Sequence, residues 1–230
     1  CGEPTTSHLC LCCHSEIPQY PWQNSNFICS VVGSNFSGKS CFIAVLMHQV
    51  FKEFVGSMGE GTSLDFSTEE ARELFRNNYI GPILERGETP EVTRGIATNP
   101  DVRRPLIYTL STWRYLKYLH PIKKRMKTNL VMYDTPGEDF SQQRSAHALK
   151  SISRSDALVF VVDFTTFEGV AQSLGLERVS DQSPADVMQT FYNVYVLQNP
   201  RIKMGEKIRV PTAVVLSKVD LIQEHLQNSM

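Results

Sequence analysis

Short apolar runs, separated by amphipathic and polar stretches, organise the chain from Phe27 onward. Continuous apolar runs of about four to eight residues are typical of strands that are buried on both faces of a sheet. Because helical patterns alternate with these runs, the sequence predicts an α/β domain, with a mainly parallel sheet covered by helices on both faces. The predicted strands lie at residues 27–33, 106–112, 129–133, 157–162 and 212–216.

Apolar positions that recur at helical spacing predict the helices between these strands. One helix is expected over about 39–56 and a second over about 67–84. The second begins with Ser-Thr-Glu-Glu, whose hydroxyl and acidic side chains are typical of a helix N-terminus. Further helices are expected over 142–152 and 185–197.

The composition supports one sizeable core, because 41% of the 230 residues are hydrophobic. The 23 Lys and Arg residues nearly balance the 24 Asp and Glu residues, so the net charge of −1 predicts no general binding of nucleic acid or anionic lipid. Basic residues gather at 117–127 between two predicted strands, where we expect a solvated hairpin, although they would also suit phosphate or lipid headgroups. No apolar run approaches the roughly 20 residues that span a bilayer, and no leader pattern is present, so a cytoplasmic protein without a transmembrane segment is expected.

The first 14 residues hold four of the six cysteines. Cys10 and Cys13 have the C-x-x-C spacing that lets two thiolates reach one tetrahedral zinc ion from a tight turn, and Cys1 resembles the second half of another such knuckle. The alternative is a flexible cysteine-bearing tail in a reducing compartment. We predict zinc binding by Cys1, Cys10 and Cys13, with a fourth ligand supplied by an upstream cysteine, by His8 or by His14.

These patterns divide the chain into three parts. A Cys-rich, zinc-ribbon-like segment covers 1–17, a linker rich in proline and polar residues covers 18–26, and the main domain covers 27–230. The chain begins with Cys1 rather than Met, and only a few polar residues follow its last predicted element. We therefore expect a fragment of a longer protein at both ends.

The strongest chemical signal is the sequence Gly-Ser-Asn-Phe-Ser-Gly-Lys-Ser at 33–40, which fits the phosphate-loop pattern G-x-x-x-x-G-K-[ST] without a mismatch. It lies where a predicted strand passes into a predicted helix, as such a loop requires. Its glycines let successive N–H groups face phosphate oxygens, Lys39 reaches the β- and γ-phosphates, and the Ser40 hydroxyl binds Mg²⁺. The predicted phosphate-binding residues are Gly33, Ser34, Asn35, Phe36, Ser37, Gly38, Lys39, Ser40 and Cys41.

A second signal, Asp-Thr-Pro-Gly at 134–137, ends the predicted strand 129–133. Beside a phosphate loop, a carboxylate at a strand end is placed to make a second Mg²⁺ contact, which we assign to Asp134. The Gly137 N–H would sense the γ-phosphate. Without the phosphate loop, a turn that only ends a strand would be the preferred interpretation.

A third signal, Ser-Lys-Val-Asp at 217–220, follows the apolar run 212–216. With it, the chain resembles the P-loop GTPases of the Ras and translation-factor class, whose three motifs occur in this order on three separate strands. The resemblance implies a three-layer, Rossmann-like P-loop sheet that binds GTP or GDP with Mg²⁺. It also implies that Asp220 accepts hydrogen bonds from guanine N1 and N2, while the aliphatic stem of Lys218 lies on the ring. Ser217 stands where the family usually has Asn or Thr.

About 100 residues separate Gly33 from Asp134, against about 30 in a simple βαβ unit, so the domain carries insertions. The long helix before 87–105, the Asp-Thr-Pro-Gly-Glu-Asp sequence and the Cys-rich head together resemble the double-GTPase family, bacterial proteins predicted to act in conflict or anti-phage systems. This resemblance implies a protein effector, or a second GTPase domain or subunit, as partner. The strand and helix that complete a GTPase sheet after the guanine motif are expected to be missing.

Two catalytic roles follow from the resemblance. A threonine between the first helix and the second strand should close on Mg²⁺ and the γ-phosphate, and Thr93 is favoured over Thr89 and Thr98. Glu138 occupies the position of the glutamine that orients the attacking water in Ras-like enzymes, and its charge beside a triphosphate predicts slow hydrolysis. Candidates for an arginine finger within the same chain are Arg94, Arg103 and Arg104.

The sequence thus predicts a GTP-binding switch with slow Mg²⁺-dependent hydrolysis, in which Lys39, Thr93 and Glu138 are catalytic. An ATP-using P-loop hydrolase is an alternative, against which Asp220 argues. An interaction module with a degenerate nucleotide site is another, against which the intact Lys39 and Asp134 argue.

Overall fold

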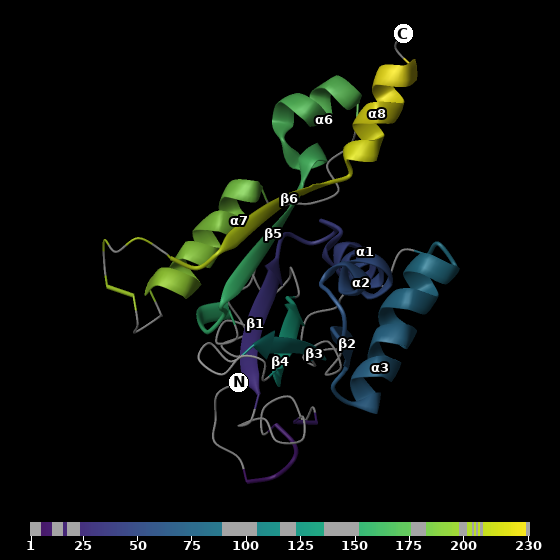
Figure 1. Cartoon of the computed structure of the whole chain (residues 1–230). Helices are drawn as coiled ribbons and strands as arrows, with labels where there is room; N and C mark the ends of the chain where they lie inside the picture. Colours follow the sequence, from purple (N-terminus) through teal and green to yellow (C-terminus); the bar gives the residue numbers. More distant parts are fainter. Residues whose placement is uncertain are drawn as a thin grey trace. The chain divides into compact units, whose positions relative to one another are not determined.

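The computed structural model of the chain describes residues 6–10, 16–17, 24–88, 105–115, 123–135, 152–175, 183–197, 202–203, 205, 207 and 209–228. Within these residues, six strands form a sheet in the order β2-β3-β4-β1-β5-β6, with helices between the strands (Figure 1). The predicted α/β fold is confirmed. The chain forms two compact units, the first from 1–29, 40–90 and 104–133 and the second from 30–39, 91–103 and 134–230.

The first unit contains three neighbouring antiparallel strands. The register between the first two of these strands pairs Phe66 with Tyr108. The register between the second and third pairs Tyr115 with Lys123, so the hairpin predicted around the basic segment is confirmed as a pair of long strands. A strand at 63–66 was not predicted, because only two of its four residues are apolar. The elements with residues in this unit are β1 (Ser25–Val32), α1 (Lys39–Gln49), η1 (Val50–Phe54), α2 (Val55–Ser57), β2 (Ser63–Phe66), α3 (Glu69–Phe75), η2 (Arg76–Glu85), β3 (Leu106–Tyr115) and β4 (Lys123–Asp134).

Aromatic packing forms the core of the first unit. The ring of Tyr108 on β3 is fully buried, and its centroid lies 4.9 Å from that of Phe66 and 5.5 Å from that of Phe51. Helix α3 begins where the sequence predicted, because the Thr68 hydroxyl accepts a hydrogen bond from the Ala71 N–H. Rings from β2, β3 and η1 thus pack together in the core of this unit.

The second unit is built around two parallel strands. Register pairs Leu158 with Thr212 and Asp163 with Ser217, so both strands end at the same edge. Parallel neighbours of this kind place the residues that follow them close together, which is where α/β proteins bind ligands. The elements with residues in this unit are the end of β1, the last residue of β4, β5 (Ala157–Asp163), η4 (Phe164–Thr166), α6 (Glu168–Leu174), α7 (Pro184–Phe191), η5 (Tyr192–Leu197), β6 (Thr212–Ser217) and α8 (Val219–Asn228).

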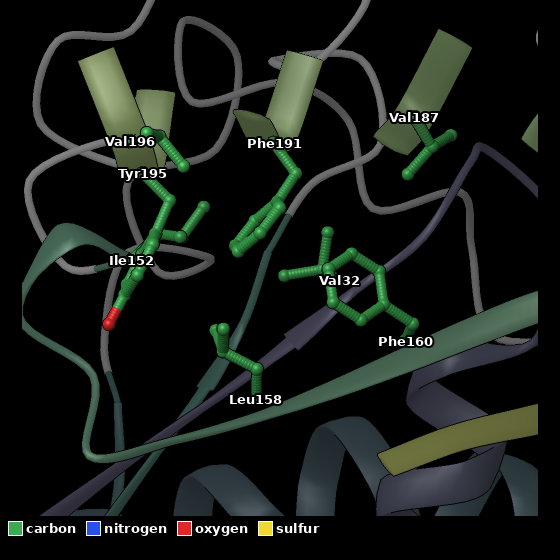
Figure 2. Close-up of a cluster of buried hydrophobic side chains, with 8 residues drawn as sticks. All are labelled: Val32, Ile152, Leu158, Phe160, Val187, Phe191, Tyr195 and Val196. Carbon is green, nitrogen blue, oxygen red and sulfur yellow. The ribbon is translucent and has the colours of Figure 1, made fainter. Parts of the chain in front are cut away.

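A cluster of buried side chains packs β1 and β5 against α7 and η5. Figure 2 shows the side chains of α7 and η5 directed toward those of β1 and β5, with the Phe160 and Phe191 rings meeting edge to face at 4.9 Å. Helix α7 starts with a capping box, in which Ser183 and Asp186 satisfy each other's backbone N–H groups. The cluster contains Val32, Ile152, Leu158, Phe160, Val187, Phe191, Tyr195 and Val196. This cluster forms a packed hydrophobic core in the second unit.

Most of the predicted boundaries hold within a few residues. The helix predicted over 39–56 corresponds to the run α1, η1 and α2, and the helix predicted over 185–197 corresponds to α7 and η5. The strand predicted over 157–162 extends to Asp163. Most of the helix predicted over 142–152 lies outside the described residues, and the division into segments 1–17, 18–26 and 27–230 stays a prediction.

Candidate functional site

The phosphate-loop sequence connects the end of β1 to the start of α1. Within it, the Lys39 ammonium donates hydrogen bonds to the carbonyl oxygens of Gly33 at 3.1 Å and Ser34 at 2.7 Å. Lys39 is only 6% exposed. The side chain is therefore folded along the inside of its own loop, with its charge held by neutral oxygen atoms.

Two positions in this loop are sterically or conformationally restricted. A Cβ atom on Gly33 would lie 2.4 Å from the Val161 carbonyl oxygen, so only glycine fits between the loop and β5. Phe36 has φ of 60° although it is not glycine, and the left-handed conformation costs such a residue about 1–2 kcal/mol. Its side chain is 51% exposed. The loop backbone thus curves around the Lys39 side chain, with a left-handed conformation at Phe36.

The electrostatics of Lys39 fit an anionic ligand. Burial lowers the pKa of the Lys39 ammonium to about 8, and the Asp134 carboxylate opposes this shift. An ammonium held by neutral carbonyl groups retains charge for additional acceptors, and phosphate oxygens form strong charge-assisted bonds with it. Ser37 is also fully buried in this loop, and its Oγ has no hydrogen-bond partner among the described residues. The residues present therefore suit a phosphate group.

The Asp134 region joins the same unit through β1. Asp134 is the last residue of β4, and the next residue, Thr135, is buried. Both the backbone N–H and the hydroxyl of Thr135 donate hydrogen bonds to the Val31 carbonyl oxygen. Because Val31 lies two residues before the phosphate loop, these bonds fix where the Asp-Thr-Pro-Gly sequence starts. The carboxylate of Asp134 and the hydroxyl of Ser40 are hard oxygen donors of the kind that Mg²⁺ prefers.

The third motif follows β6. The Ser217 hydroxyl donates to the Val162 carbonyl oxygen at 3.2 Å, and Lys218 adopts a left-handed conformation with φ of 59°. Asp220 then lies in the first turn of α8 and is exposed to solvent. A Cβ atom built on Gly38 would lie 3.8 Å from the Cβ of Ser217, which is ordinary van der Waals contact. The fold therefore brings the first and third motifs side by side.

A buried residue that sequence reasoning missed joins this arrangement. Asp163, the last residue of β5, is 2% exposed, and its carboxylate accepts a hydrogen bond from the Lys218 ammonium at 2.6 Å. The only signal in the sequence is an acidic residue directly after the apolar run 157–162. An acidic residue at that place is usually interpreted as the start of a solvated turn, so the parallel register was needed to find the pair.

Several predicted site residues lie outside the described residues. Thr93, Gly137 and Glu138 are among them, so their catalytic and γ-phosphate roles stay predictions. Of the predicted zinc ligands, Cys1 and Cys13 are outside as well, whereas Cys10 is described and follows a bridge between Leu9 and Glu16. Over the described ranges, no group of three or more His, Cys, Asp or Glu side chains could hold a metal ion. The remaining predicted residues of the phosphate loop, Asn35 and Cys41, are half-buried.

The lengths and apolar character of the helices bear on whether one of them could cross a membrane. In the part of the chain that the structure describes, no helix combines the length and the apolar character needed to cross a bilayer.

Comparisons with known proteins agree with the geometry of the second unit. The chain is 26% identical over 222 residues to a protein of Mycolicibacterium smegmatis named "Putative ESX-1 scaffolding and assembly protein SaeC". The match covers 94% of this chain and 51% of that protein, so the chain spans about half the length of this relative. A family model, Double-GTPase 2, matches residues 27–230. The chain, whose phosphate loop lies beside the Ser-Lys-Val-Asp sequence at 217–220, therefore belongs to the Double-GTPase 2 family of P-loop proteins.

Proposed function

We propose that this chain is a GTP-binding molecular switch with slow, Mg²⁺-dependent GTP hydrolysis. The observation that carries the proposal is the proximity of Gly38 in the phosphate loop to Ser217 in the guanine-type motif, the Ser-Lys-Val-Asp sequence at 217–220: a Cβ atom built on Gly38 would lie 3.8 Å from the Cβ of Ser217. A nucleotide joins a phosphate chain to a base, so a site for it needs the two recognition elements side by side. Membership in a GTPase family supports the same interpretation.

The phosphate half of the site rests on Lys39. Its ammonium would bind the β- and γ-phosphates while keeping its bonds to the Gly33 and Ser34 carbonyl groups. The N–H groups of the loop and the N-terminus of α1 would hold the remaining phosphate oxygens. Bound Mg²⁺ would neutralise charge that develops on the phosphates, and we assign Ser40, Asp134 and Thr93 as the residues that hold it.

The base half of the site rests on the residues after β6. The Asp220 carboxylate would accept hydrogen bonds from guanine N1 and N2, which adenine cannot donate at those positions. The stem of Lys218 would cover one face of the ring. This pairing favours GTP over ATP, because a carboxylate without its two donors would lose hydrogen bonds that it makes with water.

Hydrolysis is proposed to be slow because Glu138 replaces a neutral glutamine. A carboxylate can accept a hydrogen bond from the attacking water, but its charge repels the triphosphate. A slow reaction keeps the GTP-bound state long enough for a partner to recognise it. The name of the relative in Mycolicibacterium smegmatis, a putative scaffolding and assembly protein, supports a protein as that partner. A role in a bacterial conflict system, suggested by the family resemblance, and a cytoplasmic location are also part of the proposal.

A zinc-binding head would complete the proposed protein. The described residues include a bridge between Leu9 and Glu16, which stand on either side of Cys10, Cys12 and Cys13 in the sequence. We propose that Cys1, Cys10 and Cys13 bind zinc together with a fourth ligand. Zinc analysis of the purified protein should then give metal that Cys10→Ser and Cys13→Ser each remove, and metal-free wild-type protein would contradict the assignment.

Phosphate release in single-turnover and multiple-turnover reactions tests the switch. We expect slow release from GTP that requires Mg²⁺, no release from the Lys39→Ala variant, and faster release from Glu138→Gln. The GTP-loaded form should bind a partner protein more tightly than the GDP-loaded form, since a ligand shifts a switch only by differential affinity. Release from ATP at the same rate as from GTP would instead favour an ATP-using hydrolase, and equal partner binding in both forms would remove the switch.

A further inference from the structure

Asp163 is a buried carboxylate that no motif of the nucleotide site includes. It ends β5, and its side chain is 1% exposed. One of its oxygens, Oδ1, accepts hydrogen bonds from the Thr165 backbone N–H at 2.9 Å and from the Thr165 hydroxyl at 2.6 Å. The other, Oδ2, accepts a bond from the Lys218 ammonium at 2.6 Å. Both oxygens therefore have fixed partners, one of which belongs to the guanine-type motif.

The ion pair holds a residue whose backbone is strained. Lys218 has φ of 59°, a left-handed conformation that a residue with a side chain adopts only when its surroundings enforce it. On one side, its neighbour Ser217 is tied to β5 by the parallel register and by the bond from its hydroxyl to Val162. On the other side, the ammonium of Lys218 is tied to the carboxylate of Asp163. Backbone and side chain are thus fixed to the same strand.

The two partners of the pair differ in freedom. The Lys218 side chain is 28% exposed, so its ammonium would otherwise be free to turn into solvent. The buried carboxylate has no such freedom, and a buried charge without a partner is strongly unfavourable. Asp163 therefore sets the position of Lys218, and the long side chain of the lysine adapts to it.

We propose that Asp163 is a positioning residue for guanine recognition, holding Lys218 so that its aliphatic stem forms one wall of the base site. Because Asp220 lies two residues after Lys218, the same anchor orients the start of α8 that carries the guanine-reading carboxylate. This inference rests on the proposed function. It deepens that function by naming the group that makes the site selective for guanine.

The competing interpretation is that Asp163 only caps the short helix η4. The Asp163→Asn variant separates the two, because an amide keeps the size of the side chain and still accepts bonds from Thr165 but loses the charge that holds Lys218. Dissociation constants for GTP and ATP are measured on the full chain with Mg²⁺. Both ligands carry the same triphosphate, so their ratio reports the base site alone. We expect the preference for GTP over ATP to fall about tenfold in Asp163→Asn.

A double-mutant cycle makes the coupling explicit. Lys218→Met keeps an unbranched aliphatic stem and removes the ammonium, so Asp163→Asn in that background should change the GTP to ATP preference no further. Asp186→Asn serves as the matched control, because Asp186 caps α7 through Ser183 and so lies at the start of a helix other than the one that follows the base motif. This control should lower the melting temperature and leave the preference unchanged.

The outcomes separate the two levels of the proposal. Equal weakening of GTP and ATP by Asp163→Asn, or additive effects with Lys218→Met, would make Asp163 a purely structural cap and overturn the inference, while a guanine preference in the wild type would leave the proposed function standing. A wild-type protein that binds ATP as tightly as GTP would overturn the proposed function, and the inference with it.

Discussion

Two lysines of the second unit are bonded in opposite ways. Lys39 is buried, and its ammonium contacts the carbonyl oxygens of Gly33 and Ser34. Lys218 is partly exposed, and its ammonium contacts the carboxylate of Asp163. The carbonyl groups bonded to Lys39 are neutral, although the nearby Asp134 carboxylate favours its charged form, whereas Lys218 is bonded directly to a carboxylate that compensates its charge.

The difference teaches which part of each side chain can act on a ligand. Lys39 offers its charge, which suits a triphosphate, and its lowered pKa reflects the cost of holding that charge in a buried loop. Lys218 has its charge occupied, so its hydrocarbon stem is what it can present to a base. Lys39, bonded to carbonyl groups, therefore suits the phosphates, and Lys218, bonded to a carboxylate, suits the base.

The largest effect is expected when the charge of Lys39 is removed. Lys39→Ala should weaken GTP binding by about 100-fold or more, because charge-assisted bonds to the phosphates are lost. The variant should remain folded, since it no longer buries an ammonium. Titration with a fluorescent GTP analogue measures the loss, and Lys52→Ala, an exposed lysine of η1, is the control. Wild-type affinity in Lys39→Ala would contradict the role of the charge.

A substitution of Asp220 tests the proposed recognition of the guanine base. Asp220→Ala should weaken GTP by about 10-fold to 100-fold and leave ATP binding nearly unchanged, because ATP makes no bonds to this carboxylate. Competition titrations with both nucleotides measure the two constants. Gln223→Ala changes an exposed residue of the same helix and should alter neither. Parallel losses of GTP and ATP would show that Asp220 does not read the base.

The lowered pKa of Lys39 should make GTP binding depend on pH. Free Lys39 loses its proton as the pH rises through about 8, whereas bound phosphates would keep it protonated. GTP affinity should therefore be constant below pH 8 and fall by about tenfold per pH unit above it. Titrations from pH 7 to pH 9.5 measure this, and Lys39→Ala should lose the dependence. A wild-type affinity that stays flat through pH 9 would contradict the lowered pKa.

The same shift has a consequence for stability, with its sign set by proton binding. The Lys39 pKa is lower in the folded state than its ordinary value of 10.5 in the unfolded chain. Between about pH 8 and pH 10.5 the unfolded state binds the additional proton, so this group makes the folded state more stable as the pH rises through that window.

The smallest effect concerns the curve of the phosphate loop. Phe36→Gly should give a protein about 1 kcal/mol more stable than Phe36→Ala, because glycine adopts a positive φ without strain while both variants lose the exposed ring. Urea denaturation of the two variants measures the difference. Equal stability would mean that the loop relaxes out of the left-handed conformation when the side chain is shortened.

Sequence patterns predicted the phosphate loop because its function requires glycines, a lysine and a hydroxyl at fixed spacing. They also predicted β5 and α7, which contribute side chains to the buried cluster, and β6, which pairs with β5 although most of its residues are exposed. Asp163 could not be predicted in the same way. Its partner is 55 positions away, and only the parallel register that pairs it with Ser217 brings it beside Lys218. Contacts set by strand pairing carry little local signal in a single sequence.

The first unit gives a second example of this limit. Strand β2 has only four residues, and it forms because β3 is already present to pair with it. Its Phe66 ring then packs on Tyr108 at 4.9 Å. Such a strand depends on tertiary contacts rather than on its own pattern, so the alternation of Leu64 and Phe66 was too short to identify it.

Equilibrium titration of GTP and ATP against the wild-type chain, with Lys39→Ala and Asp220→Ala beside it, tests the central claim most directly. We predict tight GTP binding and weak ATP binding by the wild type, loss of both in Lys39→Ala, and loss of the GTP preference alone in Asp220→Ala. Binding of GTP and ATP with equal affinity, unaffected by Asp220→Ala, would contradict the division of the site between Lys39, which binds the phosphates, and the residues after β6, which bind the base.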